Sequence, residues 1–96
     1  MEKGIYQKEG IDGGNYHRFT DVLTKKFGAK VVLGRITRES GEDMAYHLPV
    51  GLTLRTQYFY SSGKLIATAY GNKKDSKKIN DLEDKLVIAT HRERID

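Results

Sequence analysis

The stretch from Leu52 to Tyr70 decides the fold, and its sequence is LTLRTQYFYSSGKLIATAY. Two runs rich in β-branched and aromatic residues flank a Ser61-Ser62-Gly63 turn, in which Gly63 can adopt a positive φ at little cost. Such runs on either side of a short glycine-containing loop predict a β-hairpin. The rest of the chain is expected to build a sheet outward from this hairpin.

A three-residue loop at Ser61 to Gly63 sets the expected register of the two strands. It places Tyr60 opposite Lys64 and, at the far end, Leu54 opposite Tyr70. One face is then expected to carry Leu52, Leu54, Tyr58, Ile66 and Tyr70. The other face is expected to carry Arg55, Gln57, Ala67 and Ala69. A two-residue turn would shift the pairing and mix the two sets.

The segments before the hairpin predict one helix and further strands. Asn15 is a favoured N-cap, and Gly28 stands where a left-handed residue commonly ends a helix. The apolar residues between them recur at helical spacing: Tyr16, Phe19, Val22, Leu23 and Phe27. The β-rich run Lys30 to Arg38 and the run Met44 to Leu48 predict two strands, and Gly4 to Lys8 predicts a short edge strand.

After Gly71 the pattern becomes that of a second helix. Asp75 or Ser76 can cap it, and apolar residues follow at Ile79, Leu82, Leu86 and Ala89. Leu86-Val87-Ile88 also suits a strand, so both structures stay open there. Together the segments predict a single α+β domain over 1–96, an antiparallel β-meander of about four strands packed by two helices, in the order (β)-α-β-β-β-β-α. Residues 1–14 are expected to be partly flexible, and 91–96 to form a frayed tail.

Composition narrows the class of protein without naming a partner. The 96 residues include no cysteine, which excludes disulfides and thiolate metal sites and fits a reducing compartment. No apolar run approaches the roughly 20 residues of a membrane span, and the amino terminus lacks the apolar region of a signal peptide. We expect a cytoplasmic protein with no cofactor and no membrane contact. The net charge of +4 favours polyanionic partners by long-range attraction.

Four lysines within six residues stand at the start of the second helix: Lys73, Lys74, Lys77 and Lys78. Cations at this position oppose the helix macrodipole, so local stability does not explain them. The dipole and the lysines together favour an anion such as a phosphate backbone. The alternative is a solvated basic face, in which Asp81, Glu83 and Asp84 absorb part of the charge by helical pairing.

A helix, an antiparallel sheet ending in a hairpin, and Ser76-Lys77-Lys78 opening a last helix together resemble the double-stranded-RNA-binding domain. In that family a serine-lysine-lysine motif binds phosphates across the RNA major groove, while the first helix and a strand-linking loop contact minor grooves. The resemblance implies that the two lysines of the motif hold phosphate. It also implies that the exposed face of the first helix, which carries Arg18 and Lys25, meets one minor groove and that His47 lies near the other. The last helix departs from the family by lacking its alanine-rich pattern, and the sheet has an extra strand.

An enzyme would need an acid, a base and a group that stabilises charge. A metal-independent ribonuclease could combine one of the histidines, His17, His47 or His91, with Arg35, Arg55 and Tyr58. However, the histidines form no motif, no His-Glu pair has zinc-ligand spacing, and no serine has the context of a triad. We therefore expect no catalytic residues and no metal site.

A protein-binding inhibitor or regulator is the alternative function. The hairpin face that carries Arg55, Gln57 and Phe59 offers a shallow patch with an arginine and an aromatic residue, two types enriched at interaction hot spots. The six tyrosines suit either a base-stacking platform or a protein interface. The sequence thus predicts a non-catalytic binding module, with the RNA or DNA backbone as the first candidate partner and a protein as the second. The oligomeric state is left open.

Overall fold

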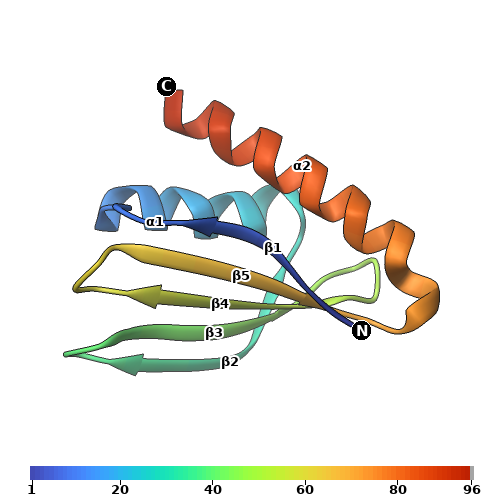
Figure 1. Ribbon diagram of the computed structural model, residues 1–96, viewed down its shortest axis with the longest axis horizontal. Helices are drawn as coiled ribbons and strands as arrows, with labels where there is room; N and C mark the ends of the chain where they lie inside the picture. The colour runs from blue at the N-terminus through green and yellow to red at the C-terminus, as the bar shows by residue number, and fades with distance from the viewer. Residues whose placement is uncertain (96) are drawn as a thin grey trace.

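The computed structural model describes residues 1–95, with side chains through residue 90. The chain forms one five-stranded antiparallel sheet, in the strand order β1-β5-β4-β3-β2, together with two α-helices (Figure 1). The elements are β1 (Glu2–Lys8), α1 (Gly13–Asp21), a π-helical turn η1 (Val22–Lys26), β2 (Lys30–Thr37), β3 (Gly41–His47), β4 (Thr53–Phe59), β5 (Lys64–Tyr70), a 3-10 turn η2 (Lys73–Asp75) and α2 (Ser76–Ile95). The predicted α+β class and element order are confirmed.

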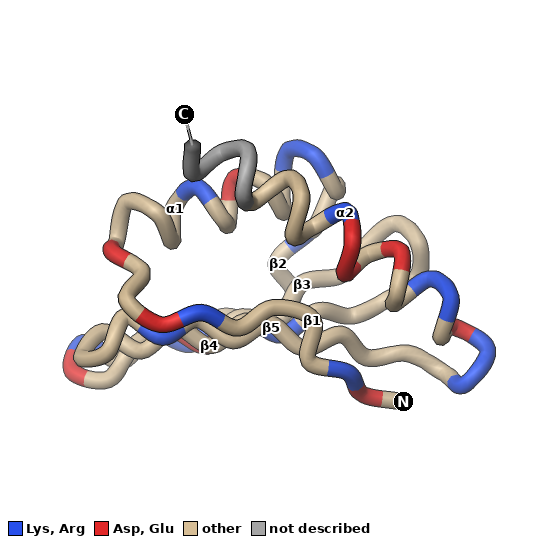
Figure 2. Tube along the Cα trace, turned by 45° about the horizontal axis from the view of Figure 1, so that its top comes forward, with Lys and Arg blue, Asp and Glu red and all other residues tan. Residues whose placement is uncertain are grey.

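The molecule has two layers, because both helices lie on the same side of the sheet (Figure 2). The core lies between the two layers, and the inward residues of the sheet pack there against the helices. The helices contribute four side chains that are at most 1% exposed: Phe19 and Leu23 from the first helical segment, and Ile79 and Leu86 from α2. An ion pair ties β1 to α2, since Lys3 Nζ lies 2.5 Å from the Glu83 carboxylate. The other side of the sheet has no helix over it in the described part of the chain, and we call it the open face.

The central hairpin is confirmed, but its predicted register is wrong by one residue. The loop has four residues, Tyr60 to Gly63, so Phe59 pairs with Lys64 and Leu54 pairs with Ala69. A slip of one residue moves a whole strand's side chains to the opposite face. The core therefore receives Leu65, Ala67 and Ala69 from β5, whereas Ile66 and Tyr70 lie half-buried on the open face. The two alanines, placed outside by the prediction, are completely buried.

Hydrogen bonds within the loop fix this longer connection. The Gly63 N–H donates to the Phe59 carbonyl over 2.8 Å, and the Ser62 hydroxyl accepts from the Lys64 N–H over 3.2 Å. Gly63 has a φ of +64°, as the sequence predicts. Leu52, Leu54 and Tyr58 are buried as expected, with Thr56 between them, while Arg55 and Gln57 are half-buried on the open face.

The first helix begins earlier than predicted. Its N-cap is Asp12 rather than Asn15, because an Asp12 carboxylate oxygen accepts from the Asn15 N–H at 2.7 Å. Asn15 therefore lies inside the first turn. The predicted apolar face is buried at Tyr16 and Phe19 and continues through Val22 and Leu23 into η1. Gly28 ends the segment with a φ of +65°, as expected.

The second helix is continuous, which decides between helix and strand for Leu86-Val87-Ile88 in favour of helix. The strand predicted over Lys30 to Arg38 is present as β2, and the one predicted over Met44 to Leu48 begins three residues earlier, at Gly41. The predicted tail, 91–96, lies outside the part of the chain whose side chains the structure describes. In the described part no helix combines the length and the apolar character that a membrane crossing requires.

Candidate nucleic-acid interface

The chain topology separates two ends of the sheet. One end, called here the hairpin end, holds the β2–β3 turn and the β4–β5 turn, which are joined by a hydrogen bond from the Tyr60 N–H to the Ser40 carbonyl (3.1 Å). The opposite end, called the lysine end, holds the 48–52 loop and the start of α2. The two segments touch there, since Lys78 Nζ lies 3.4 Å from the Val50 carbonyl oxygen.

All four predicted lysines, Lys73, Lys74, Lys77 and Lys78, are exposed at the lysine end. Figure 2 shows their basic segments as the outermost turn of the chain on that side. Among the described side chains, Lys78 alone of the four has an acidic partner, at 3.7 Å from an Asp75 carboxylate oxygen. The other three make no ion pair within the described residues. The structure thus leaves three cations free to face an external anion.

Asp75 changes the electrostatic argument made from the sequence. Its side chain is buried, and one carboxylate oxygen accepts from the Asn72 N–H at 2.8 Å, which completes a capping box before α2. The positive end of the helix dipole is therefore already matched by this carboxylate. The Asp75 carboxylate thus occupies the helix start, and joint action of the dipole and the lysines on an outside anion stays a prediction.

The structure does not join Arg18 and Lys25 to this cluster. Both lie on the outer side of the first helical segment, where they line a shallow hollow of about 150 Å³. Lys25 Nζ is 4.0 Å from the Asp21 carboxylate one helical turn away. Figure 2 shows the basic segments of α1 and η1 in the helical layer, apart from the lysine end. A single short duplex contact centred on the four lysines does not need these two residues.

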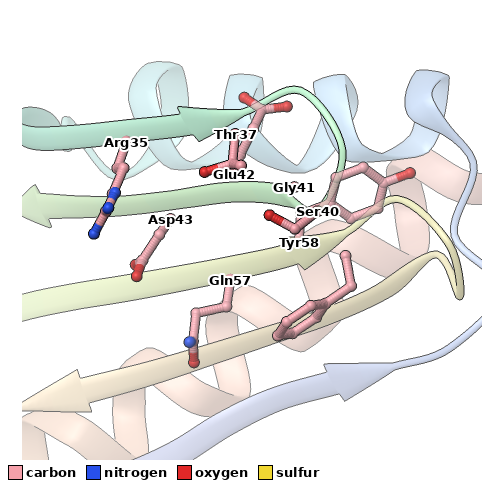
Figure 3. Close-up of a pocket in the computed structure, with 9 residues that line it drawn as sticks. Arg35, Thr37, Ser40, Gly41, Glu42, Asp43, Gln57 and Tyr58 are labelled. Atoms are coloured by element: carbon pink, nitrogen blue, oxygen red, sulfur yellow. The ribbon is translucent and has the colours of Figure 1, made fainter.

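The open face of the sheet carries the residues predicted for protein binding. Arg55 of β4 forms a two-pronged ion pair with Asp43 of β3, at 3.0 and 2.6 Å. The hydrogen bond from Arg55 holds the pKa of the Asp43 carboxyl below its ordinary value, and the nearby charge of Arg35 acts in the same direction. Figure 3 shows Arg35, Asp43 and Gln57 side by side on three neighbouring strands, where they line a hollow of about 220 Å³ that Phe59 also borders. Sequence reasoning missed Asp43, because its pairing with Arg55 depends on the β3–β4 register.

Three of the six tyrosines, Tyr16, Tyr46 and Tyr58, are buried in the core and not exposed for base stacking. Tyr16 and Tyr58 stack in the core with ring centroids 4.3 Å apart, and the Tyr58 hydroxyl donates to the Ile11 carbonyl at 3.0 Å. Burial raises the pKa of Tyr16 and of Tyr46 above the ordinary value. Tyr60, at the hairpin end, is the most exposed of the six tyrosines, at 39%. Most of the aromatic content therefore stabilises the core.

The residues considered for a ribonuclease are not brought together. His17 is on α1, whereas His47 follows the buried Tyr46 and projects to the open face. Arg35 and Arg55 share that open face, but the Tyr58 ring points into the core. The side chain of His91 lies outside the described residues. Among the side chains that the structure describes, no three His, Cys, Asp or Glu residues gather closely enough to hold a metal ion.

No protein-family model matches this chain, and no curated protein matches its sequence.

Proposed function

We propose that this protein is a non-catalytic module that binds the phosphate backbone of a nucleic acid at its lysine end. The observation that carries the proposal is the exposure, on one turn of chain, of three lysines that make no ion pair with any described side chain: Lys73, Lys74 and Lys77. Phosphate contacts of this kind supply the sequence-independent part of nucleic-acid affinity.

Duplex RNA is the form that the arrangement favours. A helix pair on one face of an antiparallel sheet, with Ser76-Lys77-Lys78 at the start of the last helix, is the feature shared with the double-stranded-RNA-binding domain. The 48–52 loop lies against the same helix start, as the contact of Lys78 with Val50 shows. A loop beside a basic helix start suits recognition of helical shape rather than of base sequence.

The test compares two triple variants of equal charge. One variant carries Lys73→Gln, Lys74→Gln and Lys77→Gln at the lysine end. The control carries Lys8→Gln, Arg38→Gln and Lys64→Gln at the hairpin end, so both proteins lose three positive charges. Fluorescence anisotropy with a labelled RNA duplex of about 16 base pairs measures affinity at about 0.1 M salt.

We expect the lysine-end variant to bind at least about tenfold more weakly than the wild type and the control variant to bind nearly as well as the wild type. Equal losses in the two variants would show a diffuse attraction without a site. Absence of wild-type binding at low salt would reject the proposed function.

A second candidate function is protein binding through the open face. The observation in its favour is that Arg55, Gln57 and Phe59 lie together on a face without a helix, where Ile66 and Tyr70 extend the patch. A partner on this face should respond to Phe59→Ala and be indifferent to the lysine-end substitutions. Isothermal titration with a partner recovered from a native lysate, using both variants, separates the two functions.

A further inference from the structure

Strand β2 is an unprotected edge of the sheet. It pairs with β3 on one side, and no described strand lies on its other side. Free edges expose backbone N–H and C=O groups that can pair with another chain, so proteins usually shorten, charge or cover them. Here the whole of Lys30–Thr37 is exposed.

The apolar side chains of this edge are exposed to an unusual degree. Val31, Val32, Leu33 and Ile36 are between 53% and 69% exposed. A near-continuous apolar run of this kind is typical of a strand that is covered by neighbours. The register of β2 against β3 shifts between Val31 and Leu33, so the unbroken part of the edge is the stretch from Leu33 to Thr37.

The two faces of β2 offer different chemistry to a neighbouring strand. On the helix side, Val31 pairs with Tyr46 and Ile36 pairs with Glu42. Val31 also borders a groove of about 270 Å³ between the sheet and α1, together with Met44 and Tyr46. On the open face, Leu33 pairs with Ala45 and Arg35 pairs with Asp43. A strand added to this edge would thus place alternate residues beside the exposed apolar side chains Val31 and Ile36 on one face and beside Arg35 on the other.

The charge of the edge selects the occupant. The stretch from Lys30 to Arg38 contains three cations and no acidic residue. Arg35 makes no ion pair in the described part of the chain, because both oxygens of the nearby Asp43 carboxylate accept from Arg55, and the Arg35 charge reaches Asp43 only through space. A second copy of β2 would add three further cations to the same ladder, and like charges across a ladder are destabilising.

We propose that β2 binds an extended segment of another protein as a sixth strand, and that this segment alternates apolar residues on the helix side with acidic residues on the open face. Main-chain hydrogen bonds to the edge supply affinity, and the two faces supply specificity. Arg35 is the residue that selects for acid, and Ile36 contributes the apolar contact. Arg35 and Ile36 pair with Asp43 and Glu42, in the half of β2 nearer the hairpin end, so this interaction goes beyond the proposed nucleic-acid binding.

The test uses end-capped, fluorescently labelled peptides of about eight residues. One peptide alternates Val and Glu, and the comparison peptide alternates Val and Lys. The protein is the full chain, either as wild type or with Arg35→Glu or Ile36→Lys on the edge. Two matched controls make the same chemical changes elsewhere: Lys77→Glu at the lysine end and Ile88→Lys on α2, where Ile88 is 53% exposed.

The Val–Glu peptide is expected to bind, to shift the NMR amide signals of β2 and to slow hydrogen exchange along it. Each edge variant should weaken binding about tenfold, and each control should leave it within about twofold. Equal binding of the Val–Lys peptide, or no Val–Glu binding at millimolar peptide, would overturn the proposal. A wild-type dimer in sedimentation that Ile36→Lys abolishes would also overturn the proposal, since the strand bound to the β2 edge would then be a second copy of this chain. Displacement of the peptide by duplex RNA would assign the edge to the nucleic-acid surface instead, whatever the lysine-end variants show.

Discussion

Replacing Gly63 with alanine tests how the central hairpin is held. Gly63 is buried in the left-handed region, and a Cβ built on it would lie 2.6 Å from the Ile11 carbonyl oxygen and 2.9 Å from the Ile11 nitrogen. The left-handed conformation costs alanine about 1–2 kcal/mol. Moving Ile11 away would also weaken two hydrogen bonds, at about 1 kcal/mol each. In one, the Ile11 N–H donates to the Gly63 carbonyl (2.9 Å), and in the other the Tyr58 hydroxyl donates to the Ile11 carbonyl. The expected loss in the free energy of unfolding is therefore about 3–4 kcal/mol.

Gly10→Ala is the matched control for the Gly63 variant. Gly10 also has a positive φ, of +76°, but no atom lies within 4 Å of a Cβ built there. Its substitution should cost only the conformational part, about 1–2 kcal/mol. Urea unfolding followed by circular dichroism measures both variants, and the gap between them isolates the contact with Ile11. Coincident midpoints for Gly63→Ala and Gly10→Ala would refute the close packing of the loop against Ile11.

Two further predictions concern named side chains. Tyr58→Phe should lower the free energy of unfolding by about 1–2 kcal/mol, because the buried Ile11 carbonyl loses its hydroxyl donor; a urea midpoint equal to that of the wild type would contradict the bond. Asp43→Asn tests the ion pair: because the pKa of Asp43 is depressed by Arg55, its carboxylate stabilises the fold above about pH 4, and this contribution is lost as the pH falls through the depressed pKa. Because the pair is exposed, we expect the free energy of unfolding of the wild type to exceed that of the variant by less than about 1 kcal/mol at pH 7. This difference should vanish in acid, and a difference independent of pH would argue against the ion pair.

Much of the fold could be predicted because its signals are local. The helical spacing from Tyr16 to Leu23, the positive φ at Gly63 and the apolar stripe of α2 each depend on residues a few positions apart. The N-cap was harder to predict, because Asp12 and Asn15 are both good capping residues three positions apart, and only the chain path chooses between them.

The faces of the hairpin could not be predicted from hydrophobicity. Ile66 and Tyr70 are larger apolar groups than Ala67 and Ala69, so a pattern-based choice places the first pair inside. The structure buries the alanines instead, where the sheet meets the packed side chains of the helices. One additional loop residue decides between the two arrangements, and the loop sequence suits either length.

The candidate surfaces also differ in how far the sequence predicts them. Exposure of the lysines followed from their density, but the role of Asp75 as a buried cap depends on the turn geometry of η2. The exposed edge at β2 could not be foreseen, because β1 returns to pair with β5 rather than with β2. This distant pairing leaves an apolar run at the edge that would otherwise be internal.

The salt dependence of duplex binding is the most direct test of phosphate binding at the lysine end. If the four lysines contact phosphates, the logarithm of the association constant on duplex DNA should fall with the logarithm of salt concentration at a slope of roughly −3 to −4. The variant with Lys73, Lys74 and Lys77 changed to Gln should show a slope of about −1, and the charge-matched hairpin-end variant should keep the wild-type slope. A wild-type slope near zero, or the same flattening in both variants, would contradict the account.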